Sequence, residues 1–145
     1  MINIVLSTDD NYAQHAAVAM ASVLKNASSP QDIRFFILDS GISQEKSAKL
    51  KQTAEKFSAM VSFIDMKKLS LPSVFISGHL SLAAYNRLFL EELLPSSVNK
   101  VIYLDVDLVV IDDIAKLWQE DLQGKPLGAV LDLGLITSAR TQKQK

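Results

Sequence analysis

The sequence predicts an α/β protein: a mostly parallel sheet covered by helices on both faces. Short apolar runs rich in β-branched residues alternate along the chain with stretches whose apolar residues recur at helical spacing. Strands that alternate with helices pair in parallel, and the crossovers place the helices on the faces of the sheet. A length of 145 residues with 48% hydrophobic residues fits one domain with a sizeable buried core.

The first apolar run, residues 2–6, predicts a strand. The polar residues 7–11 that follow favour a turn and a helix cap, because their side chains bond to nearby backbone. A helical stripe then runs through Ala16, Met20, Leu24 and Ala27, and Pro30 ends it.

Residues 33–38 predict the second strand, and Ser43 can cap a second helix. The buried stripe of that helix is expected at Leu50, Ala54 and Phe57, and Glu45 and Lys49 form an i,i+4 pair. Its lysines are expected on or near the solvent side: Lys46, Lys49, Lys51 and Lys56.

The second half of the chain predicts a third strand at 61–64, a fourth at 101–104 and a fifth at 127–131. A loop without periodicity covers 71–78, and a third helix runs from Ser81 until Pro95 stops it. The folded unit is expected to span residues 1–132. Residues 133–145 contain three basic residues and no acid, and we expect them to form a frayed basic tail.

Composition excludes several functional classes. The 15 Lys and Arg against 16 Asp and Glu give a net charge of −1, so no global field attracts nucleic acid or anionic membrane. The absence of cysteine excludes disulfides, a thiolate zinc site and a cysteine nucleophile. No apolar stretch reaches the roughly 18 residues of a transmembrane helix. We therefore expect a soluble, cytoplasmic protein, with peripheral contact to the inner membrane possible in a longer chain.

The segment that carries chemistry is Asp105-Val106-Asp107, set between apolar runs. In an extended chain, carboxylates at i and i+2 face the same side. Two like charges held close together repel unless water, hydrogen-bond donors or a hard divalent cation compensates them. The motif therefore indicates either a metal site or two solvated residues at a strand end.

Motifs of other enzyme classes are missing. The glycines form neither a dinucleotide-binding nor a P-loop pattern, and no serine-hydrolase turn or zinc-protease helix is present. A phosphoacceptor domain of the receiver type remains an alternative, with Asp9 and Asp10 after the first strand and Asp65 after the third. Against it, no lysine follows a later strand where such domains need one.

Four ordered blocks resemble glycosyltransferase family 8, the bacterial branch that includes lipopolysaccharide galactosyl- and glucosyltransferases. The blocks are residues 7–12 (STDDNY), 34–43 (RFFILDSGIS), 79–88 (with HLS and YNRL at its ends) and 100–107 (KVIYLDVD). The resemblance spans essentially the whole chain. It implies a GT-A fold that binds a UDP-sugar with Mn²⁺, or with Mg²⁺ as the alternative, and transfers the hexose to a saccharide or lipopolysaccharide acceptor with retention of configuration.

The resemblance also implies roles for individual residues. Asp105 and Asp107 would hold the metal, and Arg87 and Asp132 would contact the donor phosphate or sugar. The nucleotide would be bound by Thr8, Asp9, Asp10, Asn11, Tyr12, His79, Asp105 and Val106. Taken alone, Asp9 to Asn11 would read as a helix cap, Tyr12 as a core residue, and Arg87 as the partner of Glu91.

Members of the family run considerably further than this chain. The resemblance implies that the part not present here supplies a histidine as third metal ligand, a diphosphate-binding segment and most of the acceptor site. His15 is expected on the first helix and is not assigned to the metal. The chain is therefore interpreted as the donor-binding portion of a transferase, and the alternative is a non-catalytic remnant that at most binds UDP.

Overall fold

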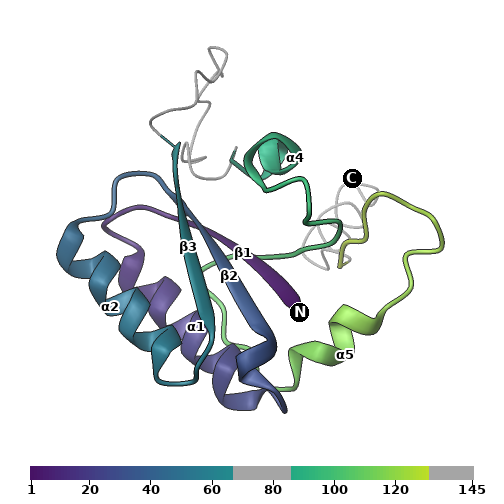
Figure 1. Ribbon diagram of the computed structural model, residues 1–145, viewed down its shortest axis with the longest axis horizontal. Helices are drawn as coiled ribbons and strands as arrows, with labels where there is room; N and C mark the ends of the chain where they lie inside the picture. Colours follow the sequence, from purple (N-terminus) through teal and green to yellow (C-terminus); the bar gives the residue numbers. More distant parts are fainter. Residues whose placement is uncertain (67–85, 131–145) are drawn as a thin grey trace, which may run out of the picture.

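A parallel sheet forms the centre of the computed structural model, which describes residues 1–66 and 86–130 (Figure 1). Within these ranges the sheet has four strands in the order β3-β2-β1-β4. They are β1 (Ile2–Thr8), β2 (Ile33–Asp39), β3 (Met60–Asp65) and β4 (Ile102–Leu104). The parallel α/β class predicted from the alternating pattern is confirmed.

Strand β1 lies between the two halves of the sheet. It pairs with β2 along its whole length, from Ile2↔Ile33 to Thr8↔Asp39. On its other side it pairs with β4 over three residues, ending at Leu6↔Leu104. Because all pairings are parallel, the carboxyl ends of the strands lie at one edge of the sheet.

Helices cover both faces of the sheet. One face carries α1 (Ala13–Asn26) and α2 (Gln44–Glu55), and α5 (Ile114–Gln119) follows β4 on that side. The opposite face carries α4 (Leu90–Leu93), which follows the 3₁₀ helix η3 (Asn86–Phe89) (Figure 1). A further short 3₁₀ helix, η1 (Pro30–Asp32), leads into β2.

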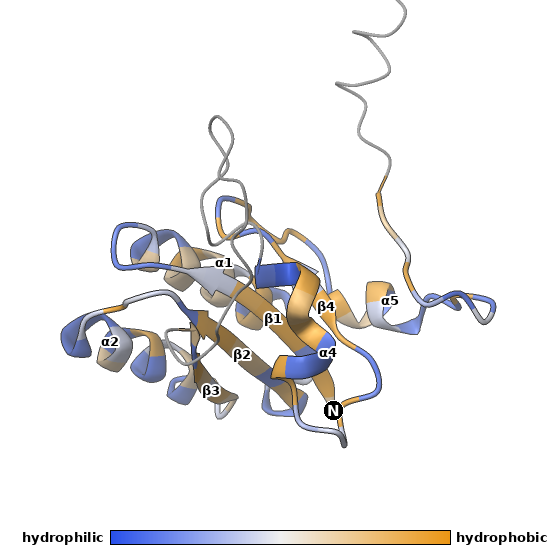
Figure 2. Cartoon of the chain, turned by 90° about the horizontal axis from the view of Figure 1, so that it is seen from above, coloured by the Kyte–Doolittle hydropathy of each residue, from blue (hydrophilic) through white to orange (hydrophobic). Residues whose placement is uncertain are grey.

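The alternation of side chains along the central strands builds two cores. Ile4 and Leu6 of β1, with Phe35 and Ile37 of β2, pack against α1 and α2. The residues between them face α4, as Val5, Phe36 and Leu38 do. Central strands buried on both faces read as continuous apolar runs, and they are drawn in the hydrophobic colour in Figure 2.

Local signals account for the helix ends. Ser43 caps α2 by accepting the N–H of Lys46, as predicted, and Glu45 pairs with Lys49 at 2.6 Å. Pro30 lies just beyond α1, which ends at Asn26. Among the described residues, no helix is long and apolar enough to cross a membrane.

Three expectations need correction. Residues 127–130 form no strand: Leu127 and Val130 are 77% and 92% exposed, and no strand edge receives them. Phe57 lies beyond the end of α2, although it still packs on the core. Lys46 lies on the solvent side as expected, with its side chain 40% exposed, and there it pairs with Asp10. The helix expected from Ser81 begins outside the described residues, and its described part is the 3₁₀ turn η3 followed by α4.

We did not predict α5, although Asp113 caps it.

The buried core of β2 makes a quantitative prediction. Phe35 is fully buried between α1, α2 and the sheet, so Phe35→Ala should lower the free energy of unfolding by about 3–5 kcal/mol. Phe63→Ala, on the edge strand β3 where the ring is partly buried, should cost clearly less. Urea denaturation of both variants measures the difference, and equal losses would contradict this account of the core.

Candidate functional site

The candidate site lies where the carboxyl ends of β1 and β4 meet. The chain adds β2 and β3 on one side of β1 and then returns to add β4 on the other. In open α/β sheets, ligands bind outside the carboxyl ends of the strands at such a change of direction. The turn after β1 and the Asp105–Asp107 segment after β4 are thereby placed side by side, because Leu6 pairs with Leu104.

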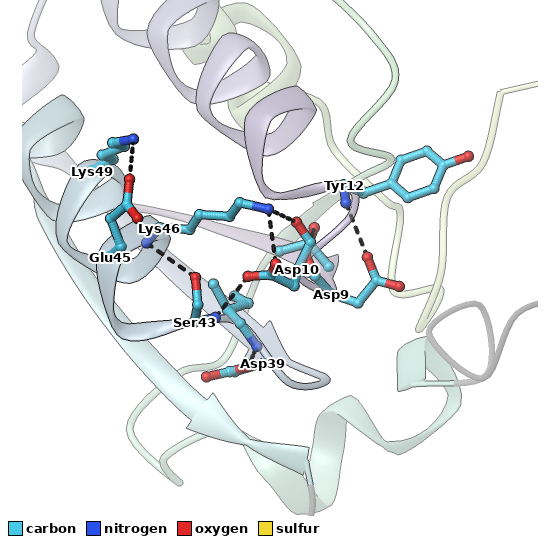
Figure 3. A network of polar contacts seen from close by, with 10 residues as sticks. Asp9, Asp10, Tyr12, Asp39, Ser43, Glu45, Lys46 and Lys49 are labelled. Carbon is cyan, nitrogen blue, oxygen red and sulfur yellow. Dashed lines mark hydrogen bonds and ion pairs between the residues drawn. The ribbon is translucent and has the colours of Figure 1, made fainter.

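The turn after β1 is ordered by Asp9. Its Oδ1 accepts the N–H of Tyr12 at 3.0 Å, just before α1 begins at Ala13 (Figure 3). Thr8 is buried, and its hydroxyl donates to the Asp9 carbonyl. Asn11 is exposed, and so is Tyr12, at 52%; the Tyr12 ring centroid lies 5.1 Å from that of His15. Tyr12 is therefore not a core residue, and the segment 9–12 presents polar and aromatic side chains to solvent.

Asp10 points away from this turn, towards α2. Its carboxylate accepts the N–H of Ser43 at 2.8 Å and pairs with Lys46 Nζ at 2.8 Å, as Figure 3 shows. The hydrogen bond from Lys46, with that from Ser43, lowers the pKa of Asp10 to about 2. Asp10 thus fastens the turn after β1 to the start of α2.

The Asp105–Asp107 segment follows β4 as a turn. Because β4 ends at Leu104 and Val106 and Asp107 form a turn, the alternation of an extended strand does not describe them. Val106 packs against the core, whereas Asp105 and Asp107 on either side of it are exposed. Both carboxylates are therefore exposed at the sheet edge.

Arg87, in η3, reaches this segment from the face of the sheet that α4 covers. Its Nη2 donates to Asp105 Oδ1 at 2.9 Å, so its acidic partner here is Asp105, where the sequence suggested Glu91. Its guanidinium carbon lies 4.6 Å from the ring centroid of Tyr103 in β4. Burial raises the pKa of the Tyr103 hydroxyl, and the charge of Arg87 acts in the opposite direction. The ring gives the guanidinium a flat support beside Asp105.

Asn86 anchors the start of η3 inside the protein. It is 1% exposed, and its Nδ2 donates to the hydroxyls of Ser7 and Ser40, each at 3.0 Å. Ser7 lies one residue before the end of β1, and Ser40 follows β2. Neither the pairing of Asn86 nor the support from Tyr103 follows from spacing in the sequence, because the partners lie far apart along the chain.

Of the residues implied for the site, most gather at this edge. Six of them lie around the ends of β1 and β4: Asp9, Asn11, Tyr12, Arg87, Asp105 and Asp107. Thr8 and Val106 are turned inward, and Asp10 faces α2. His79 and Asp132 lie outside the described residues. His15 lies on α1 as expected, but its position beside Tyr12 was not predicted.

The strand order rules against the receiver alternative. In that fold β1 lies between β2 and β3. Here β2 lies between β1 and β3, so a whole strand separates Asp65, at the end of β3, from β1. Asp65 therefore cannot share a phosphoacceptor site with Asp9 and Asp10.

The charges at this edge are mostly negative. Asp10 and Asp105 have cationic partners, and among described ion pairs Asp9 and Asp107 have none. In the described part of the chain, no group of three or more acidic or histidine side chains is placed to hold a metal. Asp105 and Asp107 thus offer hard oxygen ligands of the kind that Mg²⁺ and Mn²⁺ use, but only part of a coordination shell.

Comparison with known proteins identifies one family. The model of glycosyl transferase family 8 matches residues 3–145. General stress protein A of Bacillus subtilis is 31% identical over 135 residues, which are 92% of this chain and 47% of that protein. A probable galacturonosyltransferase-like protein of Arabidopsis thaliana is 38% identical over 88% of this chain and 36% of its own length. The chain spans less than half the length of these curated relatives.

Solved structures agree with this match. The galactosyltransferase LgtC, crystallised with donor and acceptor sugar analogs, superposes with a TM-score of 0.75 at 36% identity, over 92% of this chain and 48% of that chain. The bifunctional glycosyltransferase WbbM gives a TM-score of 0.71 at 25% identity, over 83% of this chain and 21% of that one. The GT-A fold expected from the sequence is confirmed.

The Asp10 contacts predict a pH effect on stability. Because its pKa in the folded state is lowered from 3.8 to about 2, Asp10 contributes stability above about pH 4 that is lost as the pH falls towards 2. In Asp10→Asn, the loss of stability between about pH 4 and pH 2 should therefore be smaller than in the wild type. Urea denaturation across that range measures it, with Asp121→Asn as a surface control. An equal loss of stability in the wild type and in Asp10→Asn would contradict the lowered pKa of Asp10.

Proposed function

Because the chain belongs to glycosyltransferase family 8, a family of sugar transferases, we propose that it binds a UDP-hexose at the ends of β1 and β4. In the whole protein, the hexose would then pass to a saccharide or lipopolysaccharide-type acceptor with retention of configuration. The observation that carries the proposal is the meeting of the 9–12 turn, the Asp105–Asp107 turn and Arg87 at the point where the strand order reverses. No catalytic residue is assigned.

The turn after β1 supplies the nucleotide pocket in this proposal. Tyr12 is exposed and stands beside His15, so its ring face can stack on uracil. Asp9 and Asn11 offer a carboxylate and an amide that can read the edge of the base. Asp9 already holds the turn through the N–H of Tyr12, so binding would require little rearrangement there.

A divalent cation, Mn²⁺ or Mg²⁺, fits the charge of this edge. A diphosphate brought to Asp9, Asp105 and Asp107 would be repelled unless a cation lay between them. Asp105 and Asp107 would hold it as two carboxylates, with phosphate oxygens and water completing its shell, as is common for Mg²⁺. When bound, such a cation stabilises the negative charge that develops on the departing diphosphate.

Arg87 would contact the donor from the other side. Its guanidinium lies on the Tyr103 ring with one edge turned to Asp105. A guanidinium carries its donors in a planar fork, a geometry that suits phosphate or sugar oxygens. Arg87 and the cation would thus approach the diphosphate from the α4 face and from the end of β4.

A remnant that binds UDP without transferring sugar is the second candidate. It would use the same pocket at the ends of β1 and β4. Release of UDP from UDP-glucose or UDP-galactose, measured with and without a saccharide acceptor, separates the two. Turnover supports the transferase, whereas binding without turnover supports the remnant.

The carboxylates of the 105–107 turn make the first functional prediction. Calorimetric titration of UDP should show tighter binding with Mn²⁺ than without it. Asp105→Ala and Asp107→Ala should each weaken the Mn²⁺-dependent part at least about tenfold, because each removes a ligand from an incomplete shell.

The matched control for these variants is Asp112→Ala, an exposed carboxylate on the same stretch of chain that pairs with Lys116. It should bind UDP and Mn²⁺ as the wild type does. Unchanged Mn²⁺-dependent binding in either Asp105→Ala or Asp107→Ala would contradict the metal assignment. Equal loss in all three variants would show a general charge effect.

The stacking role of Tyr12 makes a separate prediction. Tyr12→Ala should weaken UDP binding by about 1–3 kcal/mol, the usual cost of losing an aromatic partner of a base. Tyr12→Phe should retain most of the affinity. Val18→Ala, which trims an exposed apolar residue of α1, serves as the control. An equal affinity of wild type and Tyr12→Ala for UDP would remove Tyr12 from the pocket.

A further inference from the structure

Asn86 is a polar residue buried where the site meets the core. Only 1% of it is exposed, and its amide nitrogen donates to Ser7 Oγ and Ser40 Oγ. Its Oδ1 is buried and has no hydrogen-bond partner among the described residues. Because a serine hydroxyl both donates and accepts, both contacts persist in either orientation of the amide.

An apolar side chain of similar size would fill this place without leaving a buried oxygen unpaired. Buried polar groups that lack a partner are uncommon, and each calls for a specific explanation. The explanation offered by the structure is the pair of hydroxyls that Asn86 joins. One belongs to β1 and the other to the turn after β2, so a single side chain ties η3 to two neighbouring strand ends.

The next residue, Arg87, projects to the other side. Consecutive residues of a 3₁₀ helix are about 120° apart, so fixing Asn86 inward fixes the direction in which Arg87 leaves the backbone. Arg87 is exposed and lies over Tyr103, with its Nη2 2.9 Å from Asp105. Ser7, which accepts from Asn86, also forms a side-chain hydrogen bond with Tyr103. The anchor and the aromatic support of Arg87 are therefore connected.

We infer that Asn86 is a positioning residue: its buried amide, held by Ser7 and Ser40, fixes Arg87 on the Tyr103 ring and beside Asp105. Because Asn86 is 1% exposed, we do not place it among the residues that contact the donor. Its contribution to donor binding passes through Arg87, and that part of the inference rests on the proposed function. The placement of Arg87 in the free protein does not.

The first test uses the free protein. The side-chain Nε–Hε resonance of Arg87, assigned by its loss in Arg87→Lys, should carry a ring-current shift from Tyr103, which Tyr103→Leu removes. Asn86→Leu, similar in size but without hydrogen bonds, should move the resonance most of the way towards its position in Tyr103→Leu. Leu88→Ala trims a 72% exposed residue of the same 3₁₀ turn and should leave it in place.

An Arg87 resonance that stays at its wild-type position in folded Asn86→Leu would overturn the inference. Should Asn86→Leu fail to fold, Ser40→Ala removes one of the two partners from a partly exposed position. It should shift the resonance in the same direction by a smaller amount, and no shift would overturn the inference as well.

The second test is a double-mutant cycle on binding of UDP-glucose and UDP-galactose with Mn²⁺. Asn86→Leu should weaken binding several-fold in the wild type and by less than about twofold in the Arg87→Ala background, because its effect passes through Arg87. Full additivity would overturn the positioning role. If the wild type binds neither donor, the proposed function fails, while the resonance of Arg87 still decides the inference.

Discussion

The parallel pairing of β4 with β1 is the constraint on which the candidate site depends. The chain builds β1, β2 and β3 as consecutive neighbours and then crosses back to the free side of β1. Three residue pairs, ending at Leu6↔Leu104, set where the chain leaves each strand. A shift of this register would carry the Asp105–Asp107 turn away from Asp9 and Tyr12, and would move the Tyr103 ring from beneath Arg87.

The parts of the fold that follow local rules could be predicted from the sequence. The β1 and β2 strands are buried on both faces, so they appear as unbroken apolar runs, and the capping residue Ser43 marks the start of α2. The edge of the sheet where the site lies also follows, because acidic residues come directly after β1 and β4. Residues 127–130 show the limit of the same rule, since an apolar run becomes a strand only where a sheet edge receives it.

The contacts that shape the site could not be predicted, because they join distant parts of the chain. Lys46 lies 36 residues from Asp10, and Asn86 lies 79 residues from Ser7. No periodicity encodes such pairs. Arg87 illustrates the difficulty: helix spacing offers Glu91 as its partner, yet a 3₁₀ turn anchored by Asn86 directs it to Asp105. Family resemblance identified Arg87, whereas its support by Tyr103 emerged from the structure alone.

The brevity of β4 has a consequence for the dynamics of the molecule. Seven residue pairs join β1 to β2, but three join β1 to β4. Beyond these pairs, Lys100 adds hydrogen bonds. Its carbonyl accepts from the Asn3 side-chain amide, and its Nζ donates to the carbonyls of Trp118 and Glu120. Local opening costs least free energy where few pairs must break, so we expect amide hydrogens of β4 to exchange with solvent through smaller fluctuations than those of β2. A ligand that contacts both strand ends is therefore expected to raise the protection of β4 from exchange.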